Sequence, residues 1–180
     1  MILSHNTIKK LVDEGKIKVL PELKPEDIRP VGIRLHLGED ILIPVPGQSI
    51  DLSAIGNVQY EKSKIPAEGY TLKPGDFILG TTYETYQVPT NIVGNLDGRS
   101  TFARLGLTIH QTSQIVDGNF EYPGSTVFEL KNNGSFNLVL KPLIPIAMLN
   151  FIELSEPVTD TSNFKYRQQV GVRPPEDDKK

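Results

Sequence analysis

The sequence of 180 residues contains no cysteine, which excludes a disulfide framework and thiolate chemistry and fits a reducing compartment. The same absence removes zinc sites that use thiolate ligands. The three histidines, His5, His36 and His110, are scattered and show neither the H-x-E nor the H-E-x-x-H spacing of zinc enzymes. We therefore expect no catalytic zinc.

Long hydrophobic runs and an excess of positive charge are also missing. No apolar segment approaches the ~20 residues of a transmembrane helix, and the first ten residues are too polar for a secretory signal. The formal net charge of −3 gives no broad basic surface. We expect a cytoplasmic protein that binds neither membranes nor nucleic acid. This net charge is still compatible with a local basic pocket for a phosphorylated small molecule.

The length suits a single domain with its own core, and a hydrophobic content of 38% is typical of globular proteins. The composition changes near the end, where the chain becomes polar and finishes in charge. We expect one domain over residues 1–155 and a tail over 156–180. The tail is either a disordered extension or a lid over an active site. Its stretch "FKYRQQVG", which interleaves aromatic with basic and amide side chains, favours the lid.

Hydrophobic periodicity predicts an all-β protein with one short helix at the N-terminus. Ser4 is a plausible cap for that helix and Gly15 its end; the stretch "KPEDIRP" predicts a further short helical turn. From residue 32 onward apolar residues alternate with period two, as in "GIRLHLG", and turn residues separate the segments. The stretch "STVFELKNNGSFNLVLK" reads as two strands joined at "NNG". Many short strands of this kind indicate a sandwich or barrel.

The stretch "GRSTFARL", residues 98–105, gathers groups that bind anions. A glycine followed by hydroxyl residues at a helix start directs backbone N–H groups at one point, and arginine adds donors suited to phosphate. Ser100 is a natural N-cap, and Arg104 lies one turn later on the same side. The alternative is a capped helical turn with solvated arginines.

Two acids stand out in the strands that follow. Alternation in "STVFELK" puts Thr126, Phe128 and Leu130 on one face and Val127, Glu129 and Lys131 on the other. Glu129 is therefore a mid-strand charge that needs a partner, and it is a candidate general base; an isolated strand Glu is otherwise simply solvated. Asp117, before Gly118, is either an Asx turn or an acceptor for a sugar hydroxyl.

Together these stretches resemble the dCTP deaminase family within the dUTPase-like superfamily. The resemblance covers nearly the whole chain, from "MILS" and "GIRLHLG" through the central "PGDFILGTTYETYQVPTNIVGNLDGRSTFARLGL" to "VDGNF", "STVFELKN" and the C-terminal "KYRQQVG". It implies a distorted β-barrel or jelly-roll of the dUTPase-like type, with a short N-terminal helix. It also implies a homotrimer whose active sites lie at the subunit interfaces.

The resemblance further implies hydrolytic deamination of dCTP to dUTP and ammonia. Mg²⁺ would accompany the triphosphate, no protein ligand would hold a metal, and no zinc would be used. Some family members also hydrolyse the product to dUMP and diphosphate. Carried over by motif, the catalytic residues would be Glu129, Ser100 and Arg104. The substrate-binding residues would be Arg99, Thr101, Asp117, Val127, Phe128, Lys165 and Gln169.

Two other functions remain open on the sequence alone. The first is a dUTP diphosphatase of the same fold, in which Asp117 would activate water at the α-phosphate. The second is a nucleotide-binding regulator that kept the pocket and lost turnover. Glu129 favours the deaminase over the diphosphatase, although it does not decide between these two enzymes. Ser100, Arg104 and Glu129 together argue against the regulator.

Overall fold

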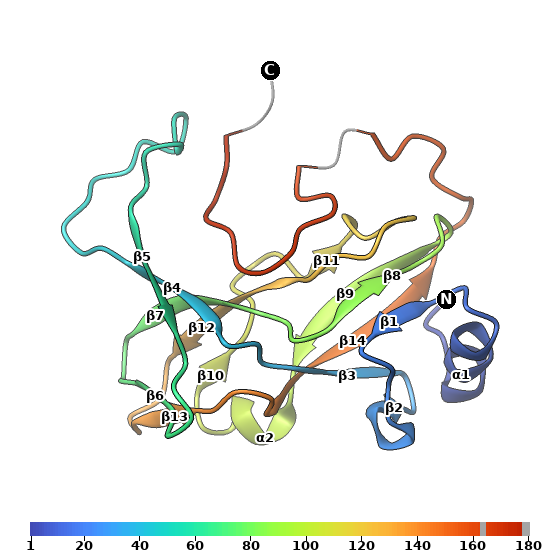
Figure 1. Ribbon diagram of the computed structural model, residues 1–180, viewed down its shortest axis with the longest axis horizontal. Helices are drawn as coiled ribbons and strands as arrows, with labels where there is room; N and C mark the ends of the chain where they lie inside the picture. Colours follow the sequence, from blue (N-terminus) through green and yellow to red (C-terminus); the bar gives the residue numbers. More distant parts are fainter. Residues whose placement is uncertain (163–164, 178–180) are drawn as a thin grey trace.

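The computed structural model describes residues 1–162 and 165–177, and strands dominate it (Figure 1). Parts of the expected tail, residues 163–164 and 178–180, lie outside the described residues. The strands are β1 Lys18–Leu20, β2 Ile28–Arg29, β3 Gly32–His36, β4 Asp40–Pro44, β5 Tyr60–Lys64, β6 Tyr70–Leu72, β7 Phe77–Thr81, β8 Thr85–Gln87, β9 Ile92–Gly98, β10 Leu107–Thr108, β11 Ile115–Val116, β12 Val127–Asn132, β13 Leu138–Leu140 and β14 Pro145–Glu153. The helices are α1 His5–Asp13 and α2 Ser100–Ala103, with a 3₁₀ turn, η1, at Pro25–Asp27.

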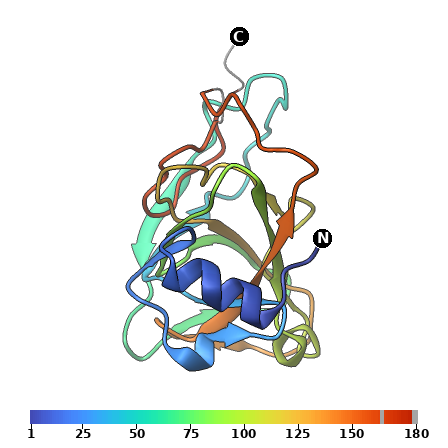
Figure 2. The same cartoon turned by 90° about the vertical axis from the view of Figure 1, so that its right-hand side faces the viewer.

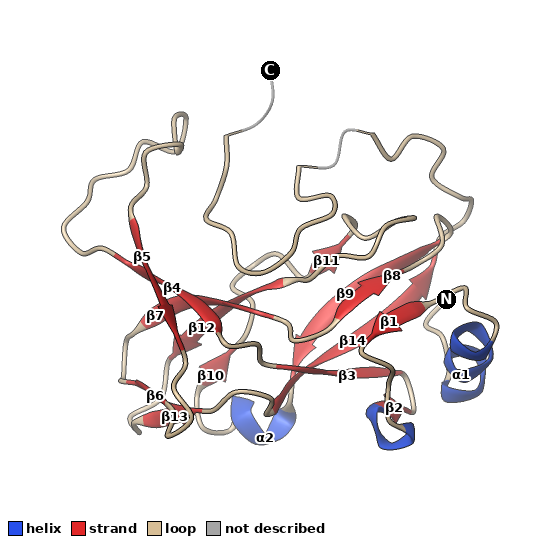
Figure 3. Ribbon diagram, viewed as in Figure 1, coloured by secondary structure: helices blue, strands red, loops and turns tan. Residues whose placement is uncertain are grey.

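Two five-stranded antiparallel sheets make up most of the protein (Figure 3). One has the order β10-β12-β7-β4-β5 and the other β11-β9-β14-β3-β2; the pairs β1-β8 and β13-β6 complete the fold. Apolar side chains from both large sheets, including Leu35, Phe128 and Leu149, meet in one buried core. The predicted all-β class is confirmed. In the described part of the chain, the sheets remain separate ladders and do not close into a complete barrel.

Helix α1 follows the sequence prediction. It begins directly after Ser4, buries Ile8 and is followed by Gly15 with a φ of +66°. That backbone conformation favours glycine and ends the helix. Figure 2 shows α1 lying along one side of the molecule. No helix in the described residues has the length and apolar character needed to cross a membrane.

One strand pairing was not foreseen, and one local prediction is wrong. Strand β13 does not form a hairpin with β12 but pairs with β6, Leu138 lying opposite Leu72. The buried Asn132 side chain directs this crossing, because its Nδ2 donates to the carbonyls of both Leu72 and Phe136. Ser100 is the first residue of α2 and not its cap; Arg99 occupies the cap position with an extended backbone.

Candidate active site

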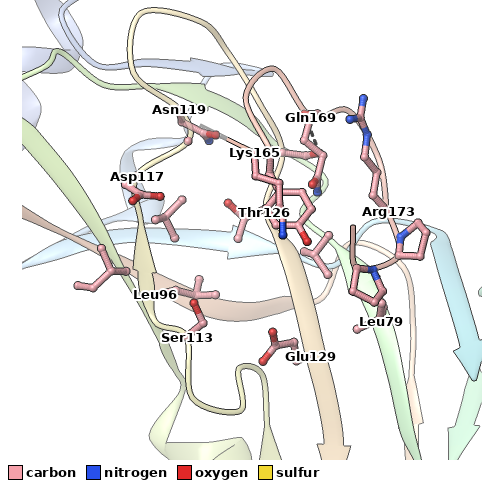
Figure 4. Close-up of a pocket in the computed structure, with 18 of the residues that line it drawn as sticks. Leu79, Leu96, Ser113, Asp117, Asn119, Thr126, Glu129, Lys165, Gln169 and Arg173 are labelled. Carbon is pink, nitrogen blue, oxygen red and sulfur yellow. Dashed lines mark hydrogen bonds between the residues drawn. The ribbon is translucent and has the colours of Figure 1, made fainter. Parts of the chain in front are cut away.

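A cavity of about 530 Å³ opens beside β12, between β11 and the C-terminal segment (Figure 4). Its size lies in the range of ligand sites. Strands β7 and β9 contribute the apolar side chains Leu79 and Leu96, while the loop after β11 and the C-terminal segment contribute most of the polar ones. The cavity therefore combines an apolar floor with a polar rim.

Glu129 reaches the cavity because of its place in β12. The strand alternates buried and part-exposed residues, so Phe128 and Leu130 enter the core while Glu129 faces outward, as predicted. One carboxylate oxygen, Oε2, accepts a hydrogen bond from the backbone N–H of Gln111 at 2.6 Å. The backbone N–H of Glu129 donates to Ile109 at 2.9 Å. The first bond orients the carboxylate and the second holds the backbone that carries it, and a group that is to orient water needs such a fixed position.

The wall next to Glu129 is held by buried hydrogen bonds. Thr126 lines the cavity, and its hydroxyl lies 2.5 Å from the hydroxyl of Tyr86. Burial raises the pKa of Tyr86, so this phenol stays neutral. Asn119 also lines the cavity, and its Nδ2 donates to the carbonyl of Gly124 at 3.0 Å. This wall is therefore preorganised.

The C-terminal segment closes one side of the cavity with Lys165, Gln169 and Arg173 (Figure 4). Gln169 is buried, and its carbonyl accepts from the backbone N–H of Ser125 at 2.7 Å. Lys165 Nζ donates to the carbonyl of Glu176 at 2.5 Å. The described part of the tail thus lines the cavity, and its action as a lid stays a prediction.

Charges of opposite sign lie on different elements around the cavity. Lys165 and Arg173 come from the C-terminal segment, whereas Glu129 lies on β12 and Asp117 follows β11 (Figure 4). Such a site can hold an elongated ligand with an anionic end near the cations and a polar, uncharged end near a carboxylate. A nucleoside polyphosphate has that distribution of charge.

The residues predicted from "GRSTFARL" do not line this cavity. Ser100, Thr101 and Arg104 are exposed on or beside α2, which lies at the end of the molecule away from the C-terminal segment in Figures 1 and 2. Arg99 Nη1 donates to the carbonyl of Pro145 at 2.5 Å. Partial burial, with the positive charges of Arg34 and Arg29, lowers the pKa of Arg99, and an anion at this place would offset that crowding.

The cavity brings together five predicted site residues: Glu129, Asp117, Val127, Lys165 and Gln169. Phe128 has its side chain in the core, and the contact expected from its backbone stays a prediction. Sequence reasoning missed several other lining residues, among them Tyr60, Asn119 and Arg173. Arg173 carried a signal, since it is a cation eight positions after Lys165 in the expected lid; Tyr60 carried none, because only the sheet pairing brings β5 to the cavity edge.

The described residues contain no group of three or more histidine and acidic side chains placed to hold a metal ion. Mg²⁺ typically binds through one or two carboxylates together with the phosphates of a substrate. The acidic residues of the cavity, Asp117 and Glu129, do not form such a group with a third ligand.

A family model described as dCTP deaminase-like matches residues 2–154. A dCTP deaminase from Aeromonas hydrophila is 36% identical over 187 residues, which cover 96% of each chain. A dCTP deaminase from Shewanella loihica is 36% identical over 184 residues, 94% of each chain. A crystal structure of 2′-deoxycytidine 5′-triphosphate deaminase from Agrobacterium tumefaciens has a TM-score of 0.62 and 16% identity over 83% of this chain. This chain covers 47% of that one, and the likeness concerns the fold.

Proposed function

This chain belongs to the dCTP deaminase-like family, and from that premise we propose that it deaminates dCTP to dUTP and ammonia in the cavity beside β12. The observation that carries the proposal is the fixed Glu129 carboxylate in a cavity whose other side presents Lys165 and Arg173. A cytosine ring has no charge and reacts at one carbon, whereas the triphosphate is strongly anionic. The two kinds of side chain match these two ends.

In the proposed mechanism Glu129 takes a proton from a water molecule, whose oxygen attacks C4 of cytosine. As the oxygen adds to C4, Glu129 passes the proton to ring nitrogen N3, which gives a tetrahedral centre. The proton of the new C4 hydroxyl then passes through Glu129 to the exocyclic amino group, the bond from C4 to that nitrogen breaks, and ammonia leaves while the C4 carbonyl of uracil forms. Ser100 and Arg104 hold the water and stabilise the charge that develops at the tetrahedral centre. The hydrogen bond from Gln111 N to one oxygen of Glu129 leaves the other oxygen to face the water.

The remaining site residues bind the nucleotide. Lys165 and Gln169 contact the triphosphate from the C-terminal segment, while Arg99 and Thr101 contact it from the α2 region. Asp117 accepts from the deoxyribose 3′-hydroxyl, and the backbone of Val127 and Phe128 contacts the nucleotide. Mg²⁺ that accompanies the triphosphate would lower the negative charge that Lys165 and the other cations must balance.

The active site is completed by a second copy of the chain. Ser100, Thr101 and Arg104 are exposed and lie outside the cavity that contains Glu129, so one chain does not unite the two groups. A homotrimer in which α2 of one copy reaches the cavity of the next would unite them at each interface.

An assay of products tests this function against the two alternatives. The purified protein is incubated with Mg²⁺ and either dCTP or dUTP, and both ammonia and diphosphate are measured. Ammonia from dCTP is the expected result, and diphosphate in addition would extend the reaction to dUMP. Diphosphate from dUTP without ammonia from dCTP would identify a dUTP diphosphatase instead. Binding with neither product would leave a nucleotide-binding regulator.

A further inference from the structure

The turn at residues 120–124 lies against the C-terminal segment that supplies Lys165 and Gln169. The guanidinium of Arg167 stacks over the ring of Tyr122, with 4.4 Å from its central carbon to the ring centroid. This distance is well within the ~6 Å range of a cation–π interaction. Arg167 Nε is buried and makes no hydrogen bond to the described residues, so the stack on Tyr122 is a contact of the guanidinium that does not depend on this atom.

Backbone contacts also join the C-terminal segment to the loop that contains this turn. The carbonyl of Gln169 accepts from the backbone N–H of Ser125 at 2.7 Å. A Cβ added to Gly118 would lie 3.5 Å from the carbonyl of Tyr166, and one added to Gly124 would lie 3.3 Å from the carbonyl of Gln169. The segment therefore runs along the turn from Tyr166 to Gln169.

The turn itself is held in one conformation. Glu121 has a φ of +61°, which is unfavourable for a residue with a side chain and persists only when its surroundings impose it. The backbone N–H of Tyr122 donates to Phe120 at 2.7 Å, and Glu121 Oε2 accepts from the hydroxyl of Thr161 at 3.0 Å. These contacts therefore hold the backbone of Tyr122 in one position next to Arg167.

We propose that Tyr122 and Arg167 are positioning residues that dock the C-terminal segment and thereby place Lys165 and Gln169 for the triphosphate. Neither residue lines the cavity, so they act through the segment and not on the nucleotide. Arg167 lies two residues from each of the two predicted phosphate ligands, and the stack limits how far both can move from the cavity. The effect on dCTP rests on the proposed function, whereas the docking itself does not.

Kinetics of three variants test the role in substrate binding. Tyr122→Ala is expected to raise KM for dCTP about three- to tenfold, the value of one partly buried cation–π pair, and to leave kcat nearly unchanged. Tyr122→Phe keeps the ring face and should restore the wild-type KM. Phe136→Ala removes another exposed aromatic side chain, which lies between β12 and β13, and should have no effect. A fall in kcat with unchanged KM would overturn the proposal.

A double variant separates docking from direct phosphate contact by Arg167. If Arg167 acts through Tyr122, the double variant Tyr122→Ala with Arg167→Ala should be no worse than the more affected single variant. Multiplied effects of the two changes on KM would refute this coupling.

Proteolysis tests the docking without any substrate. Trypsin should cleave after Lys165 several-fold faster in Tyr122→Ala than in wild type, Tyr122→Phe or Phe136→Ala, as measured by mass spectrometry. Equal cleavage rates in all four proteins would overturn the docking, even if dCTP turns over. Faster cleavage in a protein that does not act on dCTP would retain the docking and reject the proposed function.

Discussion

Glu129 and Arg104 are expected to complement each other when different copies of the chain supply them. Glu129→Gln keeps a carbonyl oxygen that can accept from the N–H of Gln111 and removes only the base. Arg104→Ala changes an exposed side chain, so its effect on the free energy of unfolding should stay within about 0.5 kcal/mol. Each variant alone should fold and be nearly inactive.

The size of the two losses follows from the proposed roles. Removal of a general base costs about 10²- to 10⁴-fold in rate, and removal of a donor that stabilises developing charge costs about 10²- to 10³-fold in kcat. The two variants are unfolded together in equal amounts and refolded. At each interface site, the copy that supplies residue 129 then has the glutamate half of the time, and the copy that supplies residue 104 independently has the arginine half of the time. Activity should therefore recover to about a quarter of wild type.

Ammonia release from dCTP is the assay, and a same-cavity pair is the control. Glu129 and Asp117 line one cavity of one chain, so mixing Glu129→Gln with Asp117→Ala should restore no site. Recovery in that control, or no recovery when Glu129→Gln is mixed with Arg104→Ala, would refute the shared site.

Three further predictions follow from the same structure. Truncation after Pro157 removes Lys165 and Gln169 and should raise KM for dCTP, with a thermal midpoint of unfolding close to wild type; an unchanged KM would make the tail dispensable. Asn132→Ala deletes two donated hydrogen bonds and one accepted one at a fully buried position, and should lower the free energy of unfolding in urea by about 3 kcal/mol. Chelation of Mg²⁺ with EDTA should weaken dCTP binding measured by calorimetry, and equal affinity with and without chelator would contradict a metal that travels with the phosphates.

The fold was predictable where local pattern and tertiary contacts agree. Period-two alternation located β3 and β12, and the alternation around Glu129 predicted which side chains of β12 face the cavity. The pairing of β13 was not predictable in this way. The turn "NNG" favours a hairpin locally, but the buried Asn132 side chain binds two distant carbonyls and directs β13 to β6.

Individual residues of the candidate site were predictable from the sequence, but the complete lining of the cavity was not. Motifs identified Glu129, Asp117, Val127, Lys165 and Gln169, and the structure gathers them around one cavity. Residues such as Tyr60 reach the cavity only through sheet pairing, which leaves no motif in the sequence. The exposed side chains of the α2 region lie outside this cavity, and under the proposed function they would act in the cavity of a second copy, which no local pattern in the sequence shows.

Comparison of wild type with Glu129→Gln tests the central claim most directly. Ammonia release from dCTP is measured for both proteins, and dCTP binding is measured by calorimetry for both. The account predicts a loss of about 10²-fold or more in the rate of ammonia release with nearly unchanged affinity. A variant that releases ammonia at the wild-type rate would contradict the role of Glu129, and with it the proposed mechanism.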